Sequence, residues 1–184
     1  MLYAIRFGHF KTFQNNANGN YQITGFHMSG ELLGMDAIST DRHLCEAVAL
    51  EDSEVCEIPY SKLENLLQTI PTLLRHFHRV MSREISHDQS IMLLLSNMKA
   101  HERLAAFLLN LSSRYATRGY SPNHFQLRMT REEIGNYLGL AVESVSRLFS
   151  DFKKKGWINI NHREVEILDM QAFRSMVMGD AFCD

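Results

Sequence analysis

Residues 130–163 constrain the fold most strongly, because two short helical patterns joined by a glycine are followed by two strand patterns. Thr130 and Glu133 have the spacing of a capping box, which predicts that a helix begins here. Gly139 ends this helix, since a tight turn after a helix requires a positive φ. Glu143 opens the second helix. Two short helices joined by a glycine turn are typical of a helix-turn-helix.

The apolar residues of both helices recur at helical spacing, which predicts that the two helices share a core. These residues are Ile134, Tyr137, Leu138, Val145, Leu148, Phe149 and Phe152. Gly156 ends the second helix, and the runs 157–160 and 164–167 predict a two-stranded wing around Asn161-His162. The whole segment therefore predicts a winged helix-turn-helix.

The polar residues of this segment indicate how it would contact double-stranded DNA. In a helix-turn-helix the first residues of the second helix meet base edges in the major groove. Arg147 can donate two hydrogen bonds to guanine, Glu143 can accept one from a cytosine amino group, and the lysines at 153–155 suit phosphates. The residues we predict to contact DNA are Thr130, Arg131, Glu143, Ser144, Ser146, Arg147, Lys153 and Lys154. Alone, the Glu, Ser and Arg residues would better fit a solvated helix face and the lysines mere solubility, and only the complete motif favours DNA.

Composition and charge exclude several classes of protein. The 184 residues carry a net charge of −2, yet residues 128–163 hold seven Lys or Arg against four Asp or Glu, a local balance of +3. A basic segment in an acidic chain is a weak sign of a polyanion-binding surface. The sequence contains no apolar run long enough to span a bilayer and no signal-peptide pattern. We therefore expect a cytoplasmic protein without membrane contact, in which the three cysteines are reduced.

The first 60 residues consist of short apolar runs separated by turn residues, and they predict an antiparallel β region. The expected strands are residues 2–6, 10–13 and 21–26, with one or two more within 46–58. The Asn-rich stretch 15–20 predicts a hairpin between the second and third strands. Because the chain starts directly on a strand, we expect an upstream partner strand to be missing and the chain to be N-terminally truncated.

Helical patterns dominate from residue 61 onward. Ser61 and Glu64 form a capping-box pattern for a short helix to residue 68. Pro71 opens the longest helical stretch, to about residue 97, residues 99–115 form a further helix, and 125–129 alternate like a strand. The predicted fold class is α+β. It comprises a partial antiparallel β-roll at 1–70, a long dimerisation helix at 71–98 and a C-terminal winged helix-turn-helix domain at 99–184.

One face of the long helix predicts a homodimer. Five of its residues follow one another at intervals of 4, 3, 4 and 3, the spacing of a heptad seam: Met81, Ile85, Asp88, Met92 and Leu95. Two protomers would bring two Asp88 carboxylates together, which weakens the dimer and lets a small signal control it. The alternatives are a helix packed only on its own domain and an Asp88 on the exposed flank.

The sequence of the helix-turn-helix closely resembles that of the CRP/FNR family of regulators. Within this family it is most similar to the FNR (fumarate and nitrate reduction) branch. The resemblance rests on residues 134–140, Ile-Gly-Asn-Tyr-Leu-Gly-Leu, followed by Glu143-Ser144-Val145-Ser146-Arg147. Further matching segments at 26–27, 34–38, 55–59, 88–89, 93–96 and 102–107 extend it over essentially the whole chain.

The resemblance implies a particular kind of DNA recognition. Glu143, Ser146 and Arg147 occupy the FNR-type Glu-x-x-Ser-Arg base-reading positions, whereas CRP-type members resemble Arg-Glu-x-x-x-Arg there. It implies a palindromic site with TTGAT-like half-sites, read by a homodimeric activator in oxygen or anaerobic regulation. It also implies a β-roll of the cyclic-nucleotide-binding, jelly-roll type and contact with RNA polymerase, for which the loop at 15–20 matches the position of one surface.

Members of this branch sense oxygen with a [4Fe–4S] cluster, held by three thiolates near the N-terminus and one in the β-roll. Cys56 matches the β-roll ligand, whereas the other three ligands have no counterpart, and Cys45 and Cys183 stand in the wrong context. One thiolate cannot hold such a cluster. We therefore expect no cofactor in this chain and Cys56 as a buried thiol in a strand. The resemblance further implies that Asp88, with Ile85 nearby, keeps the cluster-free protein mostly monomeric.

Cyclic-nucleotide binding is the natural rival within the family. Members that bind these ligands use a Gly-Glu near the pocket and an Arg-Ser pair that grips the phosphate. Gly30-Glu31 is present, but His43-Leu44 stand in place of Arg-Ser. Arg42 is one position away, and a slip of one residue in a strand turns a side chain to the other face. We therefore do not expect a nucleotide ligand.

Two rivals come from other functional classes. An enzyme or metal protein would need a catalytic set, and the sequence shows no phosphate loop or nucleophile elbow, although His9, His27 and His43 could approach one another in the β region. A truncated partner could instead keep the seam, form mixed dimers with full-length relatives and fail to bind DNA.

Overall fold

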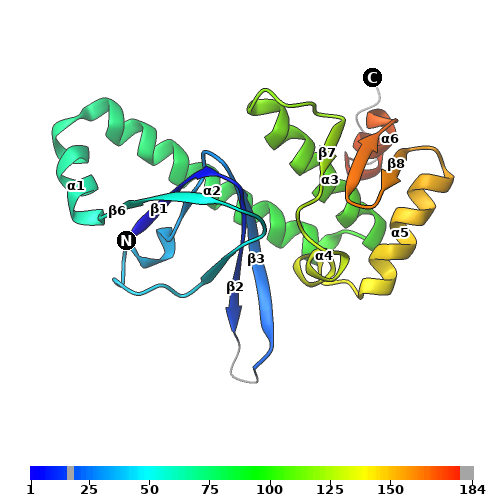
Figure 1. Cartoon of the computed structure of the whole chain (residues 1–184), viewed down its shortest axis with the longest axis horizontal. Helices are drawn as coiled ribbons and strands as arrows, with labels where there is room; N and C mark the ends of the chain where they lie inside the picture. Colours follow the sequence, from blue (N-terminus) through cyan, green and yellow to red (C-terminus); the bar gives the residue numbers. More distant parts are fainter. Residues whose placement is uncertain (16–18, 179–184) are drawn as a thin grey trace. The chain divides into compact units, whose positions relative to one another are not determined.

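The first part of the chain forms two antiparallel sheets, as its short apolar runs predict. The computed structural model describes residues 1–15 and 19–178, and the chain divides into two compact units, Met1–Ser90 and Ile91–Asp184 (Figure 1). In the described part of the first unit, β1 (Leu2–Phe7) lies between β4 (Leu32–Leu33) and β6 (Glu54–Ile58). In the second sheet, β2 (His9–Asn15) lies between β3 (Tyr21–Met28) and β5 (Glu46–Ala49).

The expected strands are confirmed, and β2 and β3 pair as the two arms of the expected hairpin, while residues 16–18 of its turn lie outside the described residues. β2 and β3 run side by side with Phe10 opposite His27, and segment 46–58 supplies two strands, one to each sheet (Figure 1). Between β4 and β5 the chain makes one short 3₁₀ turn, Met35–Ala37. Ile23, Phe26 and Met28 of β3 are buried. The unit is therefore a partial roll.

Two helices follow the strands: α1 (Tyr60–Thr69) and α2 (Pro71–Asn97). Leu67 of α1 and Phe77 of α2 are buried with Leu2 of β1 in one apolar cluster. The prediction that Ser61 caps α1 is wrong, since the helix begins at Tyr60 with Pro59 in the capping position. The fixed φ of Pro59, −59°, lets its carbonyl accept the N–H groups of Lys62 and Leu63 and starts the helix earlier.

The second unit combines helices with a small sheet. Its helices are α3 (Ala100–Thr117), α4 (Arg131–Leu138), α5 (Val142–Lys154) and α6 (Met170–Met178). The sheet has the order β7 (His124–Gln126), β9 (Glu164–Ile167), β8 (Ile158–Asn161). The buried side chains form a dense core that includes Leu104, Leu108, Ile134, Leu138, Val145, Phe149, Phe152, Ile158, Val165 and Phe173.

Helix α6 is not among the elements that the sequence analysis identified, although its signals are present. The Asp169 carboxylate accepts the N–H of Ala172 at 2.9 Å, as an N-cap residue does. Phe173 is fully buried, with its ring centroid 5.2 Å from that of Phe152. The predicted strand at 125–129 is also shorter than expected, because β7 ends at Gln126.

The boundary between the two compact units falls between Ser90 and Ile91, inside α2. The division into a β-roll at 1–70, a helix at 71–98 and a DNA-binding domain at 99–184 stays a prediction, because α2 contributes residues to both units. No helix in the described ranges is long and apolar enough to cross a membrane.

Candidate nucleic-acid interface

Helix α4 begins and ends as its sequence predicts. The Glu133 N–H donates to Thr130 Oγ1 at 3.1 Å, and the Thr130 N–H donates to Glu133 Oε2 at 2.7 Å, which completes the capping box. Gly139 ends the helix with a φ of +64°, and the Leu140 N–H donates to the Gly135 carbonyl at 2.8 Å. A Cβ at Gly135 would lie 2.5 Å from the Leu140 oxygen, so only glycine permits this turn.

Helix α5 presents one buried face and one polar face. Val145, Phe149 and Phe152 are buried as predicted, whereas Leu148, for which the sequence also predicts burial, is only half-buried. The helix starts at Val142, one residue before the predicted Glu143, because Ala141 takes the extended capping conformation. Glu143, Ser146 and Arg147 are exposed, and their i, i+3, i+4 spacing sets them on one side of the helix. Ser144 is half-buried and accepts a hydrogen bond from Arg147 Nη2 at 3.4 Å.

The lysines at the end of α5 have local contacts in the free protein. Lys153 Nζ donates to the Ile160 carbonyl of the wing at 3.1 Å, and Lys155 Nζ lies 4.4 Å from the ring centre of Trp157. Lys154 is exposed. Positive charge in the last turn of a helix is favourable at its carbonyl end, so these lysines also stabilise α5.

Arg131 differs from the other candidate DNA contacts. Its guanidinium lies 3.3 Å from the ring centre of Phe149, so the side chain is stacked on α5 rather than extended into solvent. Burial lowers the pKa of Arg131 to about 10, and Nη1 is buried without a hydrogen-bond partner in the described part of the chain. Arg131 therefore braces the helix pair in the free protein.

The predicted two-stranded wing is confirmed as the hairpin of β8 and β9, and the separately predicted strand β7 joins the same sheet. β8 and β9 pair from Ile158 opposite Ile167 to Asn161 opposite Glu164, and β7 adds on the other side of β9. His162 turns the chain between them with a φ of +51°, a conformation that His, Asn and Asp adopt more readily than most residues. Trp157 packs at the base of the wing against Phe152 and Phe173.

The predicted dimer seam on α2 is largely open to solvent in the single chain. Ile85 is 56% exposed and Met92 is 72% exposed, and Asp88 is exposed between them. Met81 and Leu95 are half-buried, and Met81 packs against the cluster of Leu2 and its neighbours.

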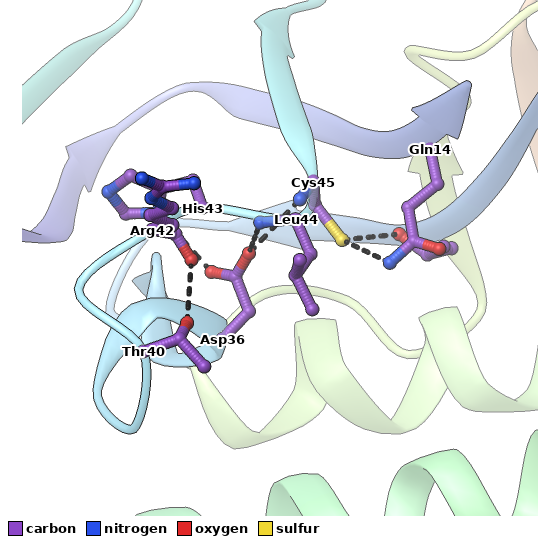
Figure 2. A network of polar contacts seen from close by, with 8 residues as sticks. Gln14, Asp36, Thr40, Arg42, His43, Leu44 and Cys45 are labelled. Atoms are coloured by element: carbon purple, nitrogen blue, oxygen red, sulfur yellow. Dashed lines mark hydrogen bonds and ion pairs between the residues drawn. The ribbon is translucent and has the colours of Figure 1, made fainter. Parts of the chain in front are cut away.

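The first unit has an open pocket of about 780 Å³, lined in part by Asp36, His43 and Cys45. The same three residues belong to the polar network drawn in Figure 2. The Asp36 carboxylate accepts the N–H groups of Leu44 at 2.6 Å and Cys45 at 3.0 Å, and it lies 3.3 Å from His43 Nδ1. Burial raises the pKa of Asp36, but the hydrogen bonds from Cys45, Leu44 and His43 outweigh burial and bring it below its ordinary value. The Asp36 carboxylate thus already occupies the backbone N–H groups of Leu44 and Cys45, which border the pocket.

The cysteines and histidines of the first unit do not converge. Cys56 lies on edge strand β6 as predicted, but it is exposed, and the prediction of a buried thiol is wrong because no described residue covers that face. Cys45 is half-buried and accepts Gln14 Nε2 at 3.3 Å, and Cys183 lies outside the described residues. The donor set that the structure describes does not fit a four-thiolate cluster.

The three histidines considered as an alternative metal site each contact a different residue. His9 contacts Glu51, His27 Nε2 lies 3.0 Å from Thr12 Oγ1, and His43 faces Asp36. Within the described ranges, no three side chains of His, Cys, Asp or Glu are grouped as metal ligands. The metal-protein alternative therefore has no support here.

A capped helix, a glycine turn, an amphipathic second helix with a polar outer face and a wing together define a winged helix-turn-helix DNA-binding protein. Joined to a partial β-roll and a long helix, this motif is typical of a class of transcription regulators. Two family models agree with this class: the cyclic nucleotide-binding domain matches residues 1–70, and the Crp-like helix-turn-helix domain matches residues 102–176.

Similar proteins narrow the class. Over 182 residues the chain is 48% identical to the transcriptional regulatory protein btr of Bordetella pertussis, covering 99% of this chain and 75% of that protein. Over 168 residues it is 52% identical to the transcriptional activator protein Anr of Pseudomonas protegens, covering 91% and 69% of the two chains. Over 175 residues it is 48% identical to the fumarate and nitrate reduction regulatory protein of Salmonella typhimurium, covering 95% and 70%.

Among solved structures, FixK2 from Bradyrhizobium japonicum matches with a TM-score of 0.86 at 28% identity, covering 95% of this chain and 86% of that one. The chain belongs to the CRP/FNR family of transcription regulators, on the branch of the FNR and Anr proteins. Its relatives are regulators rather than enzymes. The alternative of a partner that does not bind DNA finds no support, since α4, α5 and the wing are all formed.

Proposed function

We propose that this chain is a cytoplasmic activator of anaerobic genes, which binds a palindrome of TTGAT-like half-sites as a homodimer. The observation that carries the proposal is the outer face of α5, where Glu143, Ser146 and Arg147 are exposed together near the start of the helix. Residues at this place in a helix-turn-helix meet base edges in the major groove. The anaerobic role is inferred from relatives named for fumarate and nitrate reduction.

Each exposed residue has a proposed partner on the DNA. Arg147 donates two hydrogen bonds to a guanine, Glu143 accepts from a cytosine amino group, and Ser146 bonds a base or a phosphate. Ser144 holds Arg147 on this face through its contact with Nη2. Thr130, Lys153 and Lys154 contact phosphates, which position the helix without specifying sequence. Arg131 contacts the DNA backbone from its place on the Phe149 ring.

The exposed apolar side chains of α2 support the homodimer. Ile85 and Met92 stand in a heptad spacing and are more than half exposed in the single chain. A second copy of the same helix would cover them in a parallel seam. Asp88 lies between them and opposes this association by charge. The dimer is therefore weak, and it is the step at which a signal acts.

We expect no intact iron–sulfur cluster in this chain, because the described thiols do not converge. In relatives that hold such a cluster, the group supplies the oxygen response. RNA polymerase is the proposed protein partner on the promoter, as for other activators of the family.

A DNA-binding titration tests the proposal. Fluorescence anisotropy of the purified chain is measured anaerobically at two salt concentrations against a TTGAT/ATCAA palindrome and a scrambled duplex. We expect tighter binding to the palindrome and a further gain in the Asp88→Ala variant, with a higher dimer fraction in sedimentation. Asp52→Ala, which removes an exposed acid from a turn outside α2, is the control and should change neither. Equal binding of both duplexes, or none at low salt in any variant, contradicts the proposal.

A further inference from the structure

Arg103 of α3 joins two helix ends that are far apart in the sequence. Its Nε donates to the Met98 carbonyl at 2.9 Å, its Nη2 to the Leu95 carbonyl at 2.8 Å, and its Nη1 to the Leu138 carbonyl at 3.1 Å. All of these residues belong to the second compact unit. One guanidinium therefore satisfies three backbone oxygens.

The three carbonyl oxygens lie at or next to the C-terminal ends of helices, where a positive charge is stabilising. Leu95 is in the last turn of α2 and Met98 directly follows that helix, while Leu138 is the last residue of α4. The final carbonyls of a helix have no partner within it and carry a partial negative charge. The planar guanidinium holds its donors in a fixed, wide fork that can reach two such ends at once, whereas the donors of a lysine all lie on one nitrogen atom.

The contact with Leu138 reaches the base of the reading helix. Leu138 is followed by Gly139 and Leu140, and α5 begins two residues later at Val142. A Cβ at Gly139 would lie 3.4 Å from Arg103 Nη1, so the turn and the guanidinium are in close contact. The turn that sets the direction of α5 is thereby fixed to the last turn of α2.

We propose that Arg103 is a positioning residue that couples association along α2 to DNA reading by α5. The inference rests on the proposed dimer, because Leu95, whose carbonyl Arg103 binds, belongs to the predicted seam. When two α2 helices associate, the partner fixes the position of their last turns, and Arg103 transmits that position to the turn before α5. Without Arg103 the dimer still forms, but α5 gains little from it.

Four proteins are compared to distinguish the proposed coupling between dimerisation and DNA binding from a general loss of stability. They are the parent chain, Asp88→Ala, Arg103→Lys and the double variant. Dimerisation is measured by sedimentation equilibrium without DNA, and affinity for the palindrome by anisotropy. We expect Asp88→Ala to raise dimerisation equally with Arg103 or Lys at position 103. Its gain in DNA affinity should be about fivefold or more with Arg103, and less than about twofold with Lys.

Arg114→Lys on the same helix is the matched control and should leave the gain intact. The emission of Trp157, the single tryptophan, reports whether the core around Phe152 and Phe173 is folded. If Arg103→Lys loses that signal, Arg103→Gln replaces it, since its amide still donates to one carbonyl.

If Asp88→Ala raises DNA affinity as much with Lys at position 103 as with Arg103, the proposed coupling is wrong. A change in dimerisation itself between the two backgrounds also overturns it, because Arg103 would then act on the seam. If Asp88→Ala alters neither dimerisation nor binding even with Arg103, the proposed seam is wrong and the coupling falls with it. Sedimentation without DNA distinguishes that failure from the others.

Discussion

The two compact units differ in how completely they cover their own strands. In the second unit, β9 alternates exposed and buried positions, with Val165 at 0% and Ile167 at 3% exposure. In the first unit, β5 is exposed along its whole length, Glu46–Ala49. Among the large side chains that the structure describes as almost inaccessible, Leu2 comes from the first unit and the others come from the second.

This difference in burial predicts which unit is the more stable. The second unit has a dense apolar core, so the geometry of α4, α5 and the wing follows from its own sequence. The first unit positions its loops through polar contacts, among them Asp36 with Leu44 and Cys45, and His9 with Glu51. A polar contact near solvent contributes about 1 kcal/mol, and burial of a large apolar side chain contributes about 1.5–3 kcal/mol. The second unit should therefore be the more stable of the two.

The largest effect should come from removing a core ring in the second unit. Phe173 is fully buried between Phe152 and Trp157. Phe173→Ala should lower the free energy of unfolding by about 3–5 kcal/mol, because truncation of a buried phenylalanine leaves a cavity. Chemical denaturation followed by the emission of Trp157 measures the change.

Val48→Ala in the first unit is the control that tests the comparison. Val48 lies on β5 and is 43% exposed, so its truncation should change the free energy of unfolding by less than about 0.5 kcal/mol. Losses of similar size at Phe173 and Val48 would show that the two units do not differ as proposed.

The next largest effect concerns the reading face of the second unit. Arg147→Ala should weaken binding to the palindrome by about 1–3 kcal/mol and reduce the preference over the scrambled duplex, because a base contact is lost. Anisotropy titrations with both duplexes measure the two effects. The thermal unfolding temperature should hardly change, since Arg147 is exposed.

Lys154→Ala provides the contrast within α5. Loss of a phosphate contact should weaken binding to both duplexes alike and lower the salt dependence by about one unit of slope. A loss of preference in Lys154→Ala as large as that in Arg147→Ala would contradict the assignment of base and phosphate contacts.

The winged helix-turn-helix could be predicted from the sequence because its determinants are local. The capping box at Thr130, the positive φ at Gly139 and the buried face of α5 each follow from residues within about one or two helical turns of each other. The same holds for the start of α2 at Pro71. Where a local rule competed with another, prediction failed, as at Ser61, where Pro59 determined the start of the helix.

The features that could not be predicted depend on distant contacts. Exposure of Cys56 depends on what lies over β6, which the alternation of that strand does not reveal. From its position at the start of α4, Arg131 would be expected to face solvent. The structure shows instead that its guanidinium lies over the ring of Phe149. The role of Arg103 has no signature in the sequence, because its acceptors are backbone oxygens 5, 8 and 35 residues away, two before it and one after it.

The smallest effect should come from the polar network of the first unit. Asp36→Asn keeps the shape of the side chain but removes the charge that accepts the N–H groups of Leu44 and Cys45. At neutral pH the variant should be less stable than the parent by up to about 1 kcal/mol, because the carboxylate is near solvent. Hydrogen exchange of these two amides should be faster in the variant at neutral pH.

The pH dependence gives this prediction its sign. In the folded chain the pKa of Asp36 lies below its ordinary value, so its contribution to stability is present above the unfolded pKa and is lost as the pH falls through the folded pKa. Unfolding of Asp36→Asn and of the parent is followed by circular dichroism. The difference between their stabilities should disappear as the pH drops below about 4. Asp41→Asn is the matched control, since Asp41 is exposed and its φ of +55° suits asparagine equally. A gap that persists at low pH would mean that the charge of Asp36 does not account for the lower stability of the variant. The contrast between a first unit held by polar contacts and a second held by an apolar core would then lose its support.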